Sequence, residues 1–405
     1  MSRAMKDSGI PWVGEIPKNW NTPLLKGVFR EREEKTTTGE ETLLSLSQYT
    51  GIKPKSETEI ADSHIAANYE GYKVVHKGDF VMNIMLAWNG SYAVSDYDGM
   101  ISPAYCVYYF RDNSNKRYYH YLLRINDYQA AFKTLSRGII DSRLRLYPEQ
   151  FYTFPTLQPP LSEQQRIAEF LDRKCTEIDE AIALQEEFIE ELKSYKQSVI
   201  TEAVTRGINP NVKFKDSGID WIGKIPQEWN VRAIKTLAIL KSGTNITTNE
   251  ITDDGEGYPV YGGNGLRGYY SGYSNDGDFA LIGRQGALCG NINYGYGRFW
   301  ATDHCVVCYP REEYVLRWFG ETLRAMNLNQ YSLSSAQPGL SVERIKDKLM
   351  PVPPLTEQKQ IADYLDNKCT EIDSLIAIKQ QKIEELKDYK KSVIYEYVTG
   401  KKEVK

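Results

Sequence analysis

The sequence predicts an α+β fold with a pseudo-two-fold internal repeat, in which two globular α/β domains are joined by two long helices that form an antiparallel coiled coil. Three observations predict it. Two pairs of segments repeat along the 405 residues, one pair has the periodicity of long helices, and the segments in between are rich in strand and turn residues. The expected divisions are a first domain at 1–159, a first helix at 160–206, a second domain at 207–353 and a second helix at 354–405.

Each half of the chain opens and closes with a repeated segment. The opening segment DSGIPWVGEIPKNWN (7–21) matches DSGIDWIGKIPQEWN (216–230) at ten of fifteen positions. The closing segment at 161–205 matches 355–399 at twenty-eight of forty-five positions. A repeated frame therefore surrounds two divergent inserts, which indicates a duplication. The first insert is 22–158 and the second is 231–352.

The closing segments predict the two long helices. Each begins with Pro-Pro, followed by Ser162 or Thr356, whose hydroxyl can cap the first free N–H groups. Apolar residues then recur at steps of three and four between dense charges, which is typical of a coiled coil. One such helix cannot bury its apolar stripe alone, so we expect the two to pair; the alternative is two surface helices, each docked on its own domain. The expected core is Leu171, Ile178, Ile182 and Leu192 with Leu365, Ile372, Ile376 and Leu386, together with Cys175 and Cys369, and it is interrupted by Gln185, Lys196, Lys379 and Lys390.

The inserts carry strand and turn signals. Fourteen of the thirty glycines fall between Gly243 and Gly297, where they can hold positive φ and let the backbone approach a ligand closely. Interleaved Tyr and Arg can stack and hydrogen-bond on a polar, planar target, although carbohydrate-binding surfaces have a similar composition. The expected strand regions are GDFV (78–81), AWNGSYA (87–93), YCVYYF (105–110), YPVYGGNGLRGYYSG (258–272), DFALIGRQG (278–286) and FWATDHCVVCY (299–309).

Composition and charge narrow the class of protein. No apolar run is long enough to span a membrane, the N-terminus has no apolar export signal, and six scattered cysteines favour reduced thiols, so we expect a cytoplasmic protein. The net charge of −4 alone speaks against a nucleic-acid partner. However, residues 160–206 carry eleven acidic and six basic side chains, so the rest of the chain is close to neutral and DNA binding stays open.

The sequence contains no complete catalytic or metal-binding motif. Gly223-Lys224 is followed by Ile and does not form a phosphate-binding loop. The two Pro-Pro pairs lack the Asn or Asp that an amino-methyltransferase needs before them. His304-Cys305-Val-Val-Cys308 resembles half of a zinc site, but no second pair completes it. We therefore expect no catalytic site, no metal and no cofactor on this chain.

The repeated motifs resemble those of the specificity subunits of Type I restriction-modification systems. The resemblance rests on the DSGI-x-W-x-G-x-IP-x-x-W openings, the PPL-[ST]-EQ-x-x-IA helix starts, and YPVYGGNG, LIGRQGALCGNI, FWATDH and SSAQPGLS in the second insert. It covers nearly the whole chain. In the first insert, 45–68 lacks a YGGNG-type turn, so residue-level transfer is restricted there.

The resemblance implies a non-catalytic DNA-binding subunit. Two target-recognition domains would each recognise one half of a bipartite site in double-stranded DNA, and the helices would act as spacer and as docking surface for two modification (methyltransferase) subunits, and through them for restriction subunits. S-adenosylmethionine would then belong to the modification subunits, and ATP and Mg²⁺ to the restriction subunit. The alternatives are a modification-only system, a coiled-coil scaffold with two carbohydrate-binding domains, and a stand-alone enzyme.

The candidate DNA contacts are polar or aromatic residues close to turns. Arg267 and Arg284 are the preferred candidates, because Arg is the commonest specific partner of guanine. Trp88 and Tyr261 have packing as an equal alternative. The candidates in the first insert are Trp88, Asn89, Tyr92, Arg137, Arg143 and Arg145, and those in the second are Tyr261, Asn264, Arg267, Tyr269, Arg284, Gln285, Ser335 and Gln337.

Overall fold

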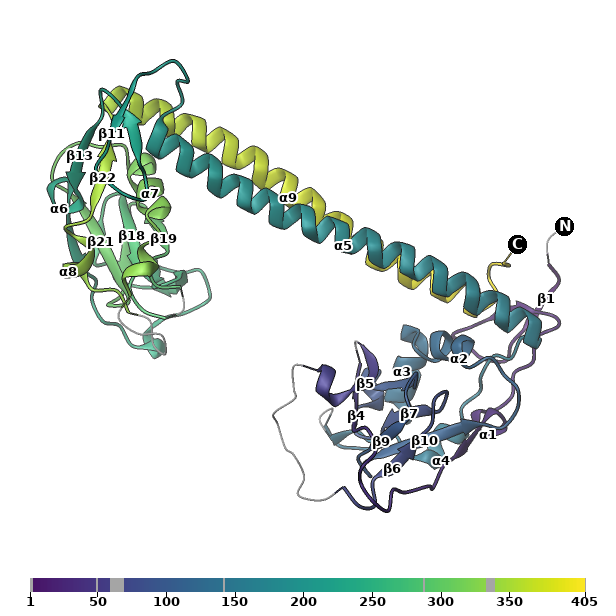
Figure 1. Cartoon of the computed structure of the whole chain (residues 1–405). Helices are drawn as coiled ribbons and strands as arrows, with labels where there is room; N and C mark the ends of the chain where they lie inside the picture. Colours follow the sequence, from purple (N-terminus) through teal and green to yellow (C-terminus); the bar gives the residue numbers. More distant parts are fainter. Residues whose placement is uncertain are drawn as a thin grey trace. The chain divides into compact units, whose positions relative to one another are not determined.

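The computed structural model has mixed helix and sheet and divides into two compact units (Figure 1). The first unit is Met1–Leu184 with Lys382–Lys405, and the second is Gln185–Gln381. Each unit therefore contains one opening segment, one insert, the start of the helix that follows it and the end of the other long helix. The residues that the structure describes are 3–48, 50–58, 69–140, 143–286, 288–332 and 339–404.

The two long helices, α5 (Leu161–Arg206) and α9 (Leu355–Val398), pair in antiparallel fashion within each unit. In the first unit the ring centroids of Phe170 and Tyr397 lie 4.3 Å apart, and further along α5 Asp179 pairs with Lys390 at 2.6 Å. In the second unit Lys196 pairs with Asp373 at 2.6 Å. Residue numbers rise along one helix as they fall along the other, so the antiparallel coiled coil is confirmed and separate docking of the helices is excluded.

The expected core of the helix pair is buried in part. Leu171, Ile178, Leu365 and Ile372 are at most 4% exposed, whereas the expected core residues nearer the middle of each helix are half-buried. Two of the interrupting lysines, Lys196 and Lys390, each reach an aspartate of the opposite helix. A cation is tolerated there because its ammonium has a carboxylate partner and remains partly in water. The half-buried residues are Ile182, Leu192, Ile376 and Leu386.

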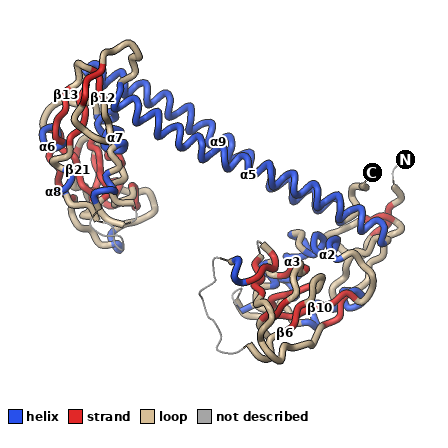
Figure 2. Tube along the Cα trace, viewed as in Figure 1, coloured by secondary structure: helices blue, strands red, loops and turns tan. Residues whose placement is uncertain are grey.

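Each insert forms a four-stranded antiparallel sheet, and the strand order is the same in both. Figure 2 shows the strands of both units in red. The order is β3-β10-β7-β8 in the first unit and β14-β21-β18-β19 in the second. The registers also correspond: Tyr105 faces Asn83 in the first sheet, and Cys305 faces Gly283 in the second. The strands are β3 (Phe29–Glu31), β7 (Phe80–Asn83), β8 (Tyr92–Val94), β10 (Tyr105–Phe110), β14 (Ala238–Ser242), β18 (Phe279–Gly283), β19 (Ile292–Gly295) and β21 (Cys305–Pro310).

The two sheets fill their cores with side chains of different size, which explains why the inserts share almost no sequence. The first sheet is packed with aromatic rings, among them Phe80 and Phe151, whose centroids lie 5.7 Å apart. At the position of Phe80 the second sheet has Ala280, whereas Tyr294 occupies the position of Val94. A smaller side chain at one position is offset by a larger one at its neighbour, so the core stays densely packed. The same sheet therefore tolerates different side chains.

Further strands and short helices complete the units. In the second unit the β15–β16 hairpin belongs to a second four-stranded sheet of order β16-β15-β20-β17, and β13 pairs with β22. The first unit contains β4 (Leu44–Ser47), β5 (Gly51–Pro54), β6 (Lys73–Val75), β9 (Gly99–Ile101), α1 (Leu25–Val28), α2 (Lys116–Leu123), α3 (Asn126–Leu135) and α4 (Pro148–Tyr152). The second contains β13 (Asn230–Ala233), β15 (Tyr258–Gly262), β16 (Gly265–Tyr270), β17 (Asn275–Asp276), β20 (Arg298–Ala301), β22 (Leu349–Val352), α6 (Ile234–Leu237), α7 (Leu316–Ala325) and α8 (Val342–Ile345).

The repeated opening segments are hairpins that dock on the repeated helix starts. They consist of β1 (Met5–Asp7) with β2 (Glu15–Pro17), and β11 (Phe214–Asp216) with β12 (Lys224–Pro226). The indole N–H of the buried Trp20 donates to Glu163 at 3.0 Å, and that of Trp229 donates to Glu357 at 2.8 Å. The repeated Trp and the repeated Glu thus belong to one contact.

Each opening hairpin also meets the end of the other long helix. In the first unit Lys401 donates to the carbonyls of Val13 and Glu15 at 2.8 and 2.6 Å. In the second unit a Cβ placed on Gly207, directly after α5, would lie 3.2 Å from the ring of Trp229 in the opening segment. Gly207 and Gly400 have φ of +76° and +73°, the left-handed conformation that ends a helix on glycine.

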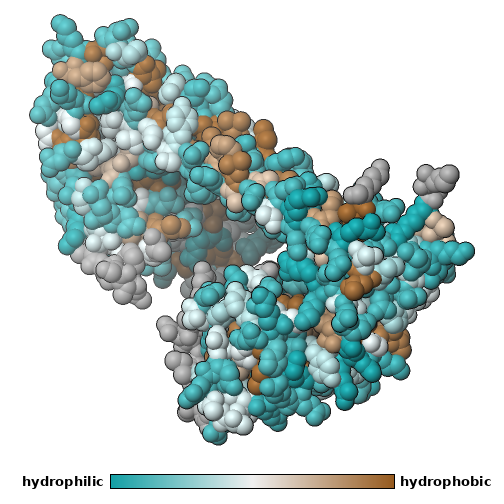
Figure 3. Space-filling model, turned by 45° about the vertical axis from the view of Figure 1, so that its right-hand side comes forward, coloured by the Kyte–Doolittle hydropathy of each residue, from teal (hydrophilic) through white to brown (hydrophobic). Residues whose placement is uncertain are grey.

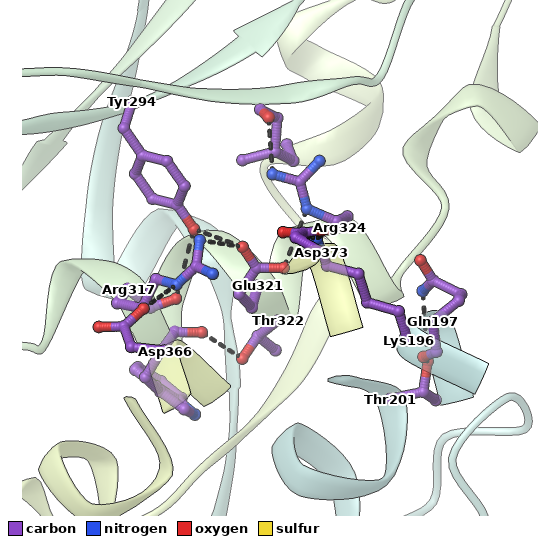
Figure 4. A network of polar contacts seen from close by, with 12 residues as sticks. Lys196, Gln197, Thr201, Tyr294, Arg317, Glu321, Thr322, Arg324, Asp366 and Asp373 are labelled. Atoms are coloured by element: carbon purple, nitrogen blue, oxygen red, sulfur yellow. Dashed lines mark hydrogen bonds and ion pairs between the residues drawn. The ribbon is translucent and has the colours of Figure 1, made fainter. Parts of the chain in front are cut away.

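Ion pairs connect each insert to its helix, and Figure 4 shows those of the second unit. Glu321 of α7 is 1% exposed, and it accepts from Arg317 at 2.7 Å, from Arg324 at 2.9 Å and from the hydroxyl of Tyr294 at 3.0 Å. Arg317 also pairs with Asp366 of α9 at 2.8 Å. In the first unit the same connection is made by α2 and α5, through Arg117 and Asp172 at 2.7 Å.

Candidate nucleic-acid interface

Three of the candidate DNA contacts meet at a pocket of the second unit. Asn264, Arg267 and Gln285 line a cavity of about 410 Å³ together with Leu266 and His304. The β15–β16 turn provides the first two residues, and Gln285 follows β18. His304 precedes β21 and is 46% exposed at its side chain. Leu266 and His304 are not among the predicted contacts, although both lie in the predicted strand regions YPVYGGNGLRGYYSG and FWATDHCVVCY.

Glycines allow the β15–β16 turn to reach this pocket. A Cβ on Gly283 would lie 2.0 Å from the carbonyl oxygen of Gly263, so no other residue fits where the turn crosses β18. Gly265 has φ of +99°, which a side chain would strain. The amide of Asn291 donates to Asn264 at 3.2 Å and fixes the tip of the turn. The YGGNG pattern is therefore explained by close backbone packing.

The other candidates of the second unit have different surroundings. Arg284 is half-buried and donates to Ser242 at 3.0 Å. Tyr261 packs edge-on against Phe299, and burial raises the pKa of its hydroxyl. Tyr269 is half-buried on β16 and forms backbone hydrogen bonds in both directions with Thr252. None of these three lines the pocket of Asn264 and Arg267. Ser335 and Gln337 lie outside the described residues.

The candidates of the first unit lie on two loops that touch. Trp88 and Asn89 follow β7 in a short 3₁₀ turn (Ala87–Asn89). Arg137 and Arg145 exchange two backbone hydrogen bonds of 2.9 Å and close a short hairpin that also contains Arg143. The N–H of Leu146 donates to the carbonyl of Ile84 at 3.0 Å, which joins the hairpin to the loop of Trp88.

Tyr92 is a correction to the expected contacts. Its side chain is 0% exposed, and its hydroxyl donates to the carbonyl of Leu123 at 2.8 Å. The ring lies 5.4 Å from Phe132 in an edge-to-face contact. A side chain with no accessible surface cannot touch DNA in this conformation, so we assign Tyr92 to the core.

The same two loops meet in the second unit. The N–H of Leu340 donates to the carbonyl of Arg284 at 2.8 Å, and Gln285 forms a bridge with Gly339. Leu340 is the counterpart of Leu146 by the offset of the closing repeat, and Arg284 is the counterpart of Ile84 by the register of the sheets. In each unit, therefore, the loop after the second strand of the sheet along the chain (β7 or β18) contacts the segment that precedes the long helix.

The surface of these loops carries cations that are available for a ligand. Arg137, Arg143, Arg145 and Arg267 are exposed, and none of them has an ion pair among the described residues. Exposed guanidinium groups suit phosphate oxygens and the acceptor atoms of guanine. The arrangement can bind DNA without any covalent chemistry.

The cysteines are not arranged as metal ligands. All six are free and buried, and burial raises the pKa of Cys305 to about 12 and that of Cys308 further. A thiolate is disfavoured under these conditions. Across the described residues no group of three or more His, Cys, Asp or Glu could hold a metal ion. None of the helices in the described ranges is long and apolar enough to cross a membrane.

Comparison with known families assigns the chain. The family model described as Type I restriction modification DNA specificity domain matches twice, at residues 17–194 and 226–388. These two matches cover most of the chain, and the chain belongs to this family. Its class is therefore that of the DNA-specificity subunits of Type I restriction-modification systems, which recognise DNA and are not themselves catalytic.

Two curated relatives illustrate the similarity. The chain is 41% identical over 146 residues to the Type I restriction enzyme EcoprrI specificity subunit of Escherichia coli, a match that spans 35% of this chain and 36% of that subunit. It is 24% identical over 392 residues to the MjaVIII specificity subunit of Methanocaldococcus jannaschii, with 88% of this chain and 87% of that one covered.

Solved structures support the fold. A chain from a study of complex assembly and conformational transition of the type I R-M system matches with a TM-score of 0.73 at 17% identity, over 95% of this chain and 98% of that one. The HsdS subunit of Thermoanaerobacter tengcongensis matches with a TM-score of 0.55 at 17% identity, over the same shares.

Proposed function

We propose that the chain recognises a bipartite sequence in double-stranded DNA, with one domain for each half-site. The recognition domains would be 1–159 and 207–353, and the helices at 160–206 and 354–405 would set the number of unread base pairs between the half-sites. The observation that carries this proposal is the pair of adjoining loops that recurs in both units. In the first unit these loops hold exposed arginines that have no ion pair among the described residues, and the loops differ in sequence between the units, as two different half-sites require.

We further propose that the long helices dock two modification subunits. Large apolar side chains are exposed at matched positions of the closing repeat: Leu184 and Ile378 are 48% and 61% exposed, and Tyr195 and Tyr389 are 55% and 51% exposed. Leu184 and Tyr389 belong to the first unit, and Tyr195 and Ile378 to the second. Each unit thus offers one such pair, which suits one partner subunit per unit.

Exposed apolar residues at matched positions favour a protein partner. On the face drawn in Figure 3 most of the surface is hydrophilic and the hydrophobic residues lie in small patches. Contiguous apolar surface on a soluble protein commonly marks an interaction site. In this proposal S-adenosylmethionine belongs to the modification subunits, ATP and Mg²⁺ belong to restriction subunits that join through the complex, and the complex works in the cytoplasm. This chain itself binds no cofactor.

Methylome sequencing tests the proposal. The gene is introduced into a methylation-deficient host together with its modification subunit, and methylated bases are mapped with and without this gene. We expect one bipartite methylated motif that appears only with the gene. The absence of any new motif, in a complex that assembles, would contradict the proposal. The presence or absence of cleavage separates a full restriction system from a modification-only one.

A further inference from the structure

The two recognition domains present different chemistry at equivalent positions. In the second unit the loop after β18 has Arg284 and Gln285, next to the polar pocket of Asn264, Arg267 and His304. In the first unit the loop after β7 has Ile84 and Met85 at those positions. The second unit therefore offers hydrogen-bonding groups, whereas the first offers aliphatic ones.

Aliphatic side chains on the joined loops of the first unit point into solvent. Ile139 is 100% exposed and Ile140 is 53% exposed in the hairpin, and Met85 and Leu86 are 37% and 44% exposed in the adjoining loop. We call these four residues the aliphatic patch. The two loops adjoin, because the N–H of Leu146 donates to the carbonyl of Ile84 at 3.0 Å.

The hairpin is held in shape by its backbone. Arg137 and Arg145 exchange hydrogen bonds of 2.9 Å, and Arg143 donates its N–H to the carbonyl of Ile140 at 2.9 Å. A Cβ on Gly138 would lie 2.6 Å from the carbonyl oxygen of Arg143, so the two sides of the hairpin are in close contact. A fully exposed Ile on a closed hairpin is unfavourable in water and favours a ligand with an apolar group.

The charges beside the patch indicate that this ligand is nucleic acid. Arg137, Arg143 and Arg145 flank the two isoleucines in the sequence of the hairpin, and none has an ion pair within the described ranges. Guanidinium groups that bind phosphates would hold a duplex against the patch. The apolar group that a duplex exposes in its major groove is the 5-methyl group of thymine.

We propose that the first domain recognises its half-site through thymine methyl groups that contact Met85, Leu86, Ile139 and Ile140, and that this half-site therefore contains A·T pairs. The inference rests on the proposed function. It adds that one half-site is distinguished mainly by apolar contacts, and that the other is distinguished by hydrogen bonds at the pocket of Arg267. Flanking arginines supply affinity without sequence preference.

Replacing thymine by deoxyuridine tests this directly, because only the methyl group is removed. The chain is assembled with its modification subunits and bound to duplexes of the motif that methylome sequencing defines. The half-site weakened by Arg267→Ala is assigned to the second domain. We expect deoxyuridine in the other half-site to weaken binding about fourfold for each contacted thymine, the effect of one buried methyl group. In the second half-site we expect less than a twofold change.

A variant locates the contact. In the double variant Met85→Ser, Ile139→Ser we expect weaker binding to the thymine duplex and a smaller effect of deoxyuridine than in the unchanged chain, because only Leu86 and Ile140 remain to contact the methyl groups. Ile208→Ser is the matched control, because Ile208 is a 38% exposed isoleucine in the second unit. Thermal unfolding of each variant shows whether the fold is retained, and exposed positions should tolerate serine.

Three results would overturn the inference. They are a first half-site without A·T pairs, deoxyuridine duplexes that bind as tightly as thymine duplexes, and a double variant that keeps its DNA affinity but loses a modification subunit. The last result would assign the patch to a protein partner. A complex with no sequence-specific binding to the thymine duplex would instead contradict the proposed function itself.

Discussion

Single residues decide whether the loops can bind a target. Asn264 and Arg267 of the β15–β16 hairpin meet Gln285 of the loop after β18 at one pocket, whereas Tyr92, which has the same kind of sequence context as Asn89, is wholly buried. The difference arises because strand residues alternate between faces, and the face of Tyr92 is covered by α2 and α3. Residues that favour turns can be recognised in the sequence. The sequence does not show, however, which face of a three-residue strand is buried.

Replacing Arg267 by Ala should relax recognition at one position of the second half-site. The exposed guanidinium lines the pocket without an ion pair among the described residues, so its loss should cost about 1–3 kcal/mol of binding, as for a base-reading arginine. Methylome sequencing of the variant measures whether one position of the second half-site accepts other bases. Arg311→Ala, at an exposed site outside that pocket, is the control. A uniform loss on all sequences would instead identify a phosphate contact.

Replacing Glu321 by Ala should destabilise the second unit strongly. The change leaves Arg317 and Arg324 without their shared carboxylate, and the side chains of both are about a third exposed (28% and 31%), so we expect about 3 kcal/mol. Urea unfolding measures the loss. Glu312→Ala removes the partner of Arg232, 34% exposed, and should cost less than about 1 kcal/mol. Equal effects of the two changes would show that the buried network contributes no more than a surface pair.

Among the elements, the long helices were the most predictable. Their period is local, so heptads, caps and the stop at Gly207 are visible in the sequence. Lys196 and Lys390 looked like defects in the expected core, and the structure shows that each pairs with an aspartate of the other helix. Such ion pairs depend on which residues of the partner helix lie opposite each lysine. The periodicity of one helix does not contain this information.

Changing one exposed pair on the helices should remove one partner subunit. The variant Leu184→Ser, Tyr389→Ser alters only the first unit, so we expect complexes with one modification subunit in place of two. Native mass spectrometry counts the subunits. The matched variant Ile378→Ser, Tyr195→Ser should behave alike, and the two combined should bind none. Two bound subunits in the combined variant would exclude this docking surface.

At the scale of the whole molecule, the duplicated frame explains how one chain serves two half-sites. Each unit uses its own opening hairpin, its own insert and parts of both long helices, as the contacts of Trp20 with Glu163 and of Trp229 with Glu357 show. The frame repeats because these contacts must be made twice. The inserts differ because each must recognise a different sequence.

Lengthening both helices should widen the gap between the half-sites. One heptad added after Gln185 and one after Gln381 keeps the periodicity and adds about 10.5 Å. At about 3.4 Å per base pair this corresponds to roughly three further unread base pairs. Methylome sequencing gives the gap, and both half-sites should stay unchanged. An unchanged gap in an active variant would show that the helices do not set the spacing.

The duplication, the two long helices and the absence of a catalytic motif follow from the sequence alone, because repeats, heptads and motifs are properties of neighbouring residues. Which loops meet and which candidates are exposed depends on tertiary contacts. The sheet pairs Asn83 with Tyr105, and a backbone hydrogen bond joins Ile84 to Leu146, contacts between residues that are distant in sequence. The two inserts fill their cores with side chains of different size, so sheets of the same strand order are formed by almost unrelated sequences.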